Sequence, residues 1–180
     1  MRSLVAALLV IGAAAPLQAQ IRVSAAYGYM GPGTAGDTDH THGITIGVAA
    51  EKSLVPQVVA GIEAQHWQSS SNGSQTTFLT ALLKLYPLPN FGGYGLVGFG
   101  YGTAHMVAPT VTYSHDNYDV SGPAVQFEVG YDFTVAPGLA LGAFVGGTNT
   151  VGNSAQKYVH VGSGNATLFN VGVSAKFAIP

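Results

Sequence analysis

The sequence has no cysteine and very few charged side chains. The absence of cysteine excludes disulfides, thiol chemistry, thiolate metal sites and attachment through a lipidated cysteine. Only 8% of the residues are Asp, Glu, Lys or Arg, whereas an ordinary soluble domain carries about 25%. The formal net charge is −2, so binding of nucleic acid has no electrostatic support. Together these absences argue against a charged, solvated outer surface.

Long apolar runs are also missing, except at the N-terminus. Met1–Ala19 combines a basic residue, Arg2, with the apolar run Leu4–Ala15 and ends on a small side chain. This order is typical of a secretory signal peptide cleaved before Gln20, and the run is shorter than the about 20 residues that span a bilayer. We therefore expect a signal peptide over 1–19 and one domain over 20–180. If the mature protein lies in a membrane, it must be a β-barrel.

What the sequence does contain is a strict alternation of side-chain type, clearest in Val125–Phe133. A period of two predicts an extended strand, because successive side chains point to opposite faces of a sheet. The apolar face carries Val125, Phe127, Val129, Tyr131 and Phe133, and the other face carries Gln126, Glu128, Gly130 and Asp132.

The same alternation predicts eight strands along the chain. They are 21–30, 43–50, 57–68, 75–86, 92–104, 125–133, 139–148 and 166–177. Four long polar connections (31–42, 69–74, 105–121 and 149–165) alternate with three short ones (51–56, 87–90 and 136–138). An even number of strands with this alternation of loop lengths is typical of outer-membrane barrels, with short turns in the periplasm and long loops outside. Both termini are then expected to be periplasmic.

The polarity of the two faces distinguishes a soluble barrel from a membrane barrel. With the apolar faces inward, the exterior would consist largely of Gly, Ala and Ser and would lack the Lys and Glu that usually cover exposed sheets. With the apolar faces outward, small and polar residues fill a narrow interior, which suits eight strands. The sequence therefore predicts an all-β fold: a closed, antiparallel, eight-stranded transmembrane barrel with an up-and-down meander.

Aromatic residues are expected to form two belts at the membrane interfaces. The predicted periplasmic belt is Tyr86, Phe91, Tyr94, Tyr131, Phe133 and Phe177, and the predicted outer belt is Tyr27, Tyr29, Trp67, Phe78, Tyr101 and Phe169. The general preference of Tyr and Phe for strands could produce part of this distribution.

These features resemble the small bacterial outer-membrane β-barrels of the OmpA-transmembrane-domain and OmpX type, over 20–177. In that group the last strand commonly carries an assembly signal of a polar residue, Gly and hydrophobic residues ending in an aromatic. Asn170, Gly172, Ala175 and Phe177 resemble this signal, although three residues follow Phe177 here. The resemblance implies a bacterial outer-membrane location. It also implies contact with outer-membrane lipid and lipopolysaccharide, and with the barrel-assembly machinery during insertion.

The predicted inward face carries charges of both signs. They are Arg22, Lys84 and Lys176 against Glu63, Glu128 and Asp132. Because buried charges must be paired or hydrated, we expect a lumen charge network that plugs the barrel and fixes its register. A narrow ion path is the alternative. The glycine stripe Gly98, Gly100 and Gly102 is expected to leave space inside.

A metal site is a further hypothesis. The segment Asp37–His42 places Asp37, Asp39, His40 and His42 together, and carboxylates with imidazoles can ligate Zn²⁺ or Cu²⁺. Against this, polar loops often collect His and Asp, and the helical spacing of i and i+4 is missing. We expect no cofactor.

An enzyme is the other alternative, because some small outer-membrane barrels are lipid A deacylases, palmitoyltransferases or proteases. His66 and Ser69 lie three apart at the predicted outer rim, whereas the deacylase type has them two apart and followed by Asn-Ala. We expect a non-enzymatic membrane anchor whose polar loops contact an unidentified surface ligand, with a narrow pore or small-solute channel as the alternative.

Overall fold

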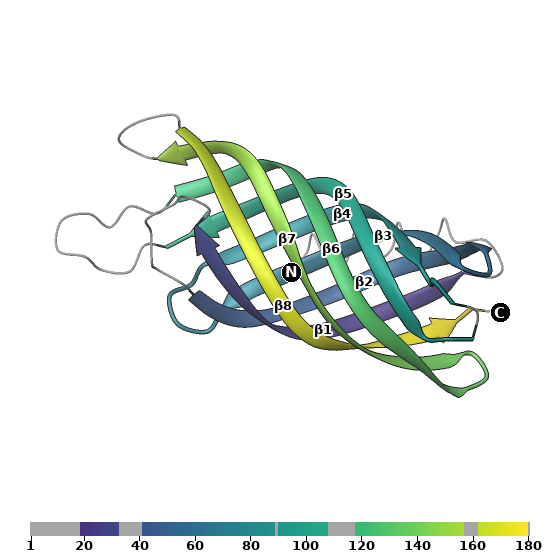
Figure 1. Ribbon diagram of the computed structural model, residues 1–180. Coiled ribbons are helices and arrows are strands. Elements are labelled where there is room, and N and C mark those ends of the chain that lie inside the picture. Colours follow the sequence, from purple (N-terminus) through teal and green to yellow (C-terminus); the bar gives the residue numbers. More distant parts are fainter. Residues whose placement is uncertain (1–18, 33–40, 89, 108–117, 157–161, 180) are drawn as a thin grey trace.

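The chain forms one closed barrel of eight antiparallel strands. The computed structural model describes residues 19–32, 41–88, 90–107, 118–156 and 162–179. The strands are β1 (Gln20–Pro32), β2 (Thr41–Val55), β3 (Val58–Ser69), β4 (Gln75–Leu85), β5 (Gly93–Met106), β6 (Tyr118–Ala136), β7 (Leu139–Gln156) and β8 (Gly162–Ala178). Each strand pairs with its neighbours in sequence, and β1 closes the barrel on β8 (Figure 1). The predicted meander of eight strands is confirmed.

Several predicted connections belong to strands. Residues 51–55 extend β2 and pair with β3, as in Glu51 with Gly61 and Lys52 with Ala60. The predicted loops 105–121 and 149–165 are too long, since β6 begins at Tyr118 and β7 pairs with β8 as far as Ser154 and Gly162. The reason is that strand pairing uses backbone hydrogen bonds, which do not need an apolar face. Of the predicted signal peptide over 1–19, residues 1–18 lie outside the described residues.

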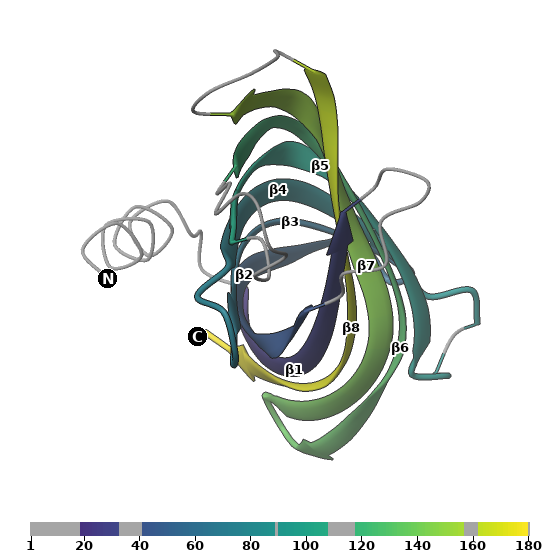
Figure 2. The ribbon, with the colours of Figure 1, turned by 90° about the vertical axis from the view of Figure 1, so that its left-hand side faces the viewer.

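The two ends of the barrel differ. We call the end that holds the connections after β1, β3, β5 and β7 the loop end, and the other the turn end. Figure 1 shows the loop end on the left, and Figure 2 looks into the barrel from that side. At the turn end the Ile179 amide donates to the Ala19 carbonyl at 2.9 Å, so both ends of the described barrel domain meet there. No helix in the described ranges is long and apolar enough to cross a membrane.

The outward face of the barrel is apolar. Phe99, Val129 and Val171 are 65%, 62% and 66% exposed, and similar side chains cover every strand. Among the residues that the structure describes, Lys52 near the turn end and Asp119 near the loop end are the Lys, Arg, Asp or Glu side chains on this face. Between these two levels the described wall therefore carries no such charge.

The interior has an apolar layer near the loop end, which the sequence analysis did not predict. Met30, Trp67, Phe78, Val120 and Leu168 are all buried there against each other. The predicted outer belt is therefore wrong for Trp67 and Phe78, which are 0% and 1% exposed. Trp67 lies near the end of β3, at a level that would suit an interfacial belt. Its side chain points inward, however, because it falls on the same face of the strand as the buried Glu63 and Gln65. Tyr86 and Tyr94 of the predicted periplasmic belt also point inward, where they contact charged groups.

The glycine stripe of β5 does not leave open space. A Cβ on Gly102 would lie 2.7 Å from Phe78 Cδ1 and 2.3 Å from Thr150 Oγ1, and one on Gly98 would lie 3.1 Å from Gln126 Oε1. On the opposite wall, Gly28 gives the same room to Trp67 Cδ1 at 3.0 Å. These glycines let large neighbouring side chains cross the narrow interior, so they help to fill it.

Candidate functional site: the buried charge network

Alternation along the strands brings seven charged side chains into the barrel. We call them the buried charge network: Arg22, Glu51, Glu63, Lys84, Glu128, Asp132 and Lys176. Arg22 and Lys176 are direct cross-strand partners on β1 and β8. Because like charges opposite each other repel, this pair requires carboxylates from other strands.

Arg22 lies at the centre of the network. Its Nη1 donates to Glu128 Oε1 at 2.6 Å and its Nη2 donates to Glu63 Oε1 at 2.9 Å. Its Nε lies 3.1 Å from Glu51 Oε1, an ion pair without the alignment of a hydrogen bond. The side chain is 0% exposed. One guanidinium thus joins three strands, β2, β3 and β6, to β1.

Two lysines extend the network toward the turn end. Lys84 Nζ donates to Glu51 Oε1 at 3.0 Å and lies 4.2 Å from the centre of the Tyr94 ring. Lys176 Nζ donates to Asp132 Oδ2, and lies 3.7 Å from Glu51 Oε2. Glu51 therefore faces all three cations, which explains how they share a narrow interior.

Neutral side chains complete the network. The Tyr94 hydroxyl donates to Glu128 Oε1 at 2.6 Å, and Gln126 Nε2 donates to Glu63 Oε2 at 2.7 Å. Just beyond β4, the Tyr86 hydroxyl donates to Asp132 Oδ2 at 2.6 Å. Burial raises the pKa of Tyr86, so its phenol keeps the proton that it donates.

All six predicted lumen charges point inward and lie in this one network. Glu51 was not among the predicted lumen charges, because residues 51–56 were expected to form a connection between strands. The signal was available: Thr45, Gly47, Ala49 and Glu51 continue the inward parity of β2 without a break. With Glu51 included, the network holds three cations and four carboxylates.

The arrangement of the network favours ion pairing between its side chains over catalysis. Arg22 and Lys176 each pair with more than one carboxylate, Lys84 pairs with Glu51, and every charged group of the network is at least nine-tenths buried. Some buried polar atoms accept or donate no hydrogen bond within the protein, including Glu51 Oε2, Asp132 Oδ1 and Ser174 Oγ. Such atoms in a native interior are normally met by water.

Only one of the four predicted metal ligands is among the described residues. Asp37, Asp39 and His40 lie outside the described residues. His42 is exposed at the start of β2, where its ring stacks on Tyr27 at 5.8 Å between centroids and tilts against Tyr29 at 5.5 Å. Within the described ranges, no group of three or more metal-binding side chains comes together.

The structure does not bring His66 and Ser69 together. His66 lies on the outward side of β3, where its Nδ1 is 2.9 Å from Thr77 Oγ1. Ser69 is buried, and its Oγ accepts hydrogen bonds from the Ser71 and Asn72 amides at 3.1 and 3.3 Å. Three residues along a strand reverse the side, so this spacing separates the two groups.

The four residues of the resembled assembly signal lie along β8. Asn170 points inward and its Oδ1 accepts a hydrogen bond from Thr45 at 2.7 Å. Phe177 points outward and is 47% exposed. Gly172 lies against β1, where a Cβ would be 2.5 Å from the Ala25 carbonyl oxygen. Ala175 is half-buried on the outward face.

Comparison with known proteins gives similarity of fold without similarity of sequence. No protein-family model matches the chain, and no curated protein matches it in sequence. Among solved structures, Neisserial surface protein A superposes with a TM-score of 0.63 at 8% identity, over 88% of this chain and 96% of that one. OprG from Pseudomonas aeruginosa gives 0.51 at 10% identity, over 88% and 95%. Ail, the attachment invasion locus protein of Yersinia pestis, gives 0.50 at 12% identity, over 91% and 100%. The chain therefore has the fold of the small eight-stranded outer-membrane β-barrels.

Proposed function

We propose that this protein spans a bacterial outer membrane as a barrel with a closed interior, and that it is a non-enzymatic anchor for surface loops. One observation carries the proposal: polarity is inverted relative to a soluble domain. Half of the chain's Lys, Arg, Asp and Glu residues are buried in the network, while the outward face of the described strands is apolar. Lipid outside and polar groups inside is the arrangement of a transmembrane barrel.

The orientation follows from the two ends. With the turn end in the periplasm, Lys52, both ends of the described barrel domain and the short turns lie there, and the loop end faces outward. Outer-membrane lipid and lipopolysaccharide then surround the apolar wall. The barrel-assembly machinery would bind the β8 segment with Asn170, Gly172, Ala175 and Phe177. The loops would bind a surface partner.

Two features support a closed interior. The apolar layer around Trp67 and Phe78 fills the barrel near the loop end, and the buried charge network follows it toward the turn end. A path for ions would have to break ion pairs that are almost fully buried, which costs several kcal/mol.

Recordings in planar lipid bilayers test this closure. We expect the intact chain to insert without unitary conductance, whereas the double variant Trp67→Gly with Arg22→Gly, which removes the largest buried side chain of the apolar layer and of the charge network, should conduct. Folding of both proteins is checked by the heat-dependent electrophoretic mobility of a barrel. Unitary openings of the intact chain similar to those of the double variant would contradict a closed interior.

A narrow water-filled path is the second candidate function. It is favoured by buried polar atoms without protein partners at several heights, including Gln65 Oε1, Thr148 Oγ1 and Thr150 Oγ1. Such atoms require water, and a continuous file of water could conduct protons. The same recordings at acidic pH decide between isolated waters and a path.

A further inference from the structure

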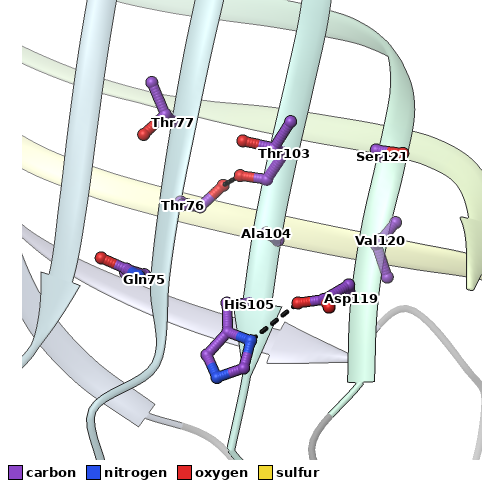
Figure 3. A pocket seen from close by; sticks show the side chains of 9 residues that line it. All are labelled: Gln75, Thr76, Thr77, Thr103, Ala104, His105, Asp119, Val120 and Ser121. Carbon is purple, nitrogen blue, oxygen red and sulfur yellow. Dashed lines mark hydrogen bonds and ion pairs between the residues drawn. The ribbon is translucent and has the colours of Figure 1, made fainter. Parts of the chain in front are cut away.

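The outward face of β4, β5 and β6 combines a polar recess with an apolar groove. The polar recess, about 350 Å³, is lined by Gln75, Thr77, Thr103, His105, Asp119 and Ser121 near the loop end (Figure 3). The apolar groove, about 370 Å³, is lined by Ala81, Leu83, Val97, Phe99 and Val125. Both recesses are formed by the same three strands.

The strand register aligns the two recesses. Thr77 pairs with Thr103 and Thr103 with Ser121 in the polar recess, and Ala81 pairs with Phe99 and Phe99 with Val125 in the apolar groove. Four residues separate these rows, which is about 13 Å along a strand. A single outward row of Leu79, Tyr101 and Pro123 lies between them. One amphiphile can therefore occupy both, with its head toward the loop end.

The chemistry of the polar recess selects the kind of head. In Figure 3 the His105 ring turns toward Asp119, and Nδ1 lies 2.7 Å from Asp119 Oδ1. Among the described residues that line the recess there is no Lys or Arg, so these residues offer a phosphate none of the cationic partners that usually bind it. Three hydroxyl side chains, one amide and one carboxylate instead complement a group with many hydroxyls. Tyr101, 54% exposed, adds an aromatic ring at the boundary.

We propose that this face binds one glycolipid, with the sugar head in the polar recess and an acyl chain in the apolar groove. The inference rests on the proposed membrane location and deepens it by naming the lipid class and its place on the barrel. The lipid would lie against β4 to β6, the strands that carry the apolar layer residue Phe78 and the network residue Glu128 on their inner side.

Native mass spectrometry of the full chain tests the proposal. The probes are a glycosyl diacylglycerol and a phosphatidylglycerol with identical acyl chains, both present in the same nanodisc. We expect the glycolipid to be retained about tenfold more than the phospholipid after the protein leaves the nanodisc. The variant Asp119→Leu, in the polar recess, should lower glycolipid retention about tenfold, the effect of losing a hydrogen bond to a charged group. The variant Val97→Trp, which fills the apolar groove, should lower glycolipid retention by excluding the acyl chain.

Two control variants keep the test specific. Thr167→Val removes an outward polar group near the loop end of β8, and Val173→Trp adds bulk to the outward face of β8; neither should change lipid retention. Insertion of every variant is checked by heat-dependent mobility. Equal retention of the two lipids by an inserted barrel, or no effect of Asp119→Leu and Val97→Trp, overturns the glycolipid site alone. A chain that does not insert into the bilayer overturns the proposed function as well.

Discussion

Arg22 is the residue on which the buried charge network depends most. It joins Glu51, Glu63 and Glu128, and none of these carboxylates has access to bulk water. Removing one partner of a buried ion pair leaves an uncompensated charge and typically costs about 3–5 kcal/mol. The variant Arg22→Met keeps much of the volume but removes the charge.

We therefore expect Arg22→Met to lower the free energy of unfolding by about 3–5 kcal/mol. Urea unfolding in lipid vesicles, followed by the fluorescence of the single tryptophan, measures this change. The matched control is Lys52→Gln on the exposed face, where the change should stay within about 0.5 kcal/mol. Equal losses for the two variants would show that burial of the network does not matter.

Gly102 and Gly95 form a second matched pair on β5. A Cβ at Gly102 would clash with Phe78 and Thr150, whereas one at Gly95 would meet nothing within 4 Å. Overpacking of a filled interior costs about 1–3 kcal/mol. Gly102→Ala should therefore be destabilising by that amount and Gly95→Ala should not, in the same unfolding measurement. A similar effect of both variants would mean that the interior is not filled at Gly102.

The sequence predicted inward charge better than inward aromatic residues. Alternation placed Arg22, Glu63 and Glu128 inside correctly, because a charge on a lipid-facing wall would have been unacceptable. Trp67 and Phe78 were misplaced, because an aromatic residue near the end of a strand fits both an interfacial belt and a filled interior. Only a strict count of alternate positions along the strand distinguishes an outward belt residue from an inward one.

At the scale of elements, β3 and β4 contribute the apolar layer through Trp67 and Phe78. Trp67 is the only tryptophan of the chain and is 0% exposed. A residue inside the barrel cannot touch lipid chains, whereas a belt residue does. Quenching by brominated lipid therefore distinguishes the two positions.

We expect brominated lipids in reconstituted vesicles to leave Trp67 fluorescence almost unchanged. The comparison protein carries Phe99→Trp, on the outward face, in a Trp67→Phe background, and its fluorescence should be strongly quenched. If Trp67 were quenched as strongly as the tryptophan at position 99, the apolar layer would not be inside the barrel.

The ends of the elements were less predictable than their number. Hydrophobic alternation stops before the strand does, because β7 and β8 continue to pair through residues such as Asn149 and Thr167, joined by a side-chain hydrogen bond of 2.6 Å. For the same reason the sequence did not predict that Glu51 belongs to β2. Where pairing depends on backbone groups alone, side-chain pattern carries little information.

At the scale of the whole molecule, the fold was predictable because three independent patterns agreed: low charge, period-two alternation and alternating loop lengths. The filling of the interior was not predictable. It depends on which side chain from one wall meets a glycine on another, as Trp67 meets Gly28 and Phe78 meets Gly102. Those contacts are set by the register between strands, which no local pattern reports.

The most direct test of the central claim is the environment of the outward face in a membrane. Because the chain has no cysteine, Val129→Cys carries a single spin label on the outward side of β6, and Ser70→Cys carries one at the loop end. In reconstituted vesicles we predict that the label at position 129 is relaxed by oxygen and shielded from a water-soluble nickel chelate, while the label at position 70 shows the reverse. A label at position 129 that the nickel chelate reaches as readily as the one at position 70 would contradict a membrane-spanning barrel.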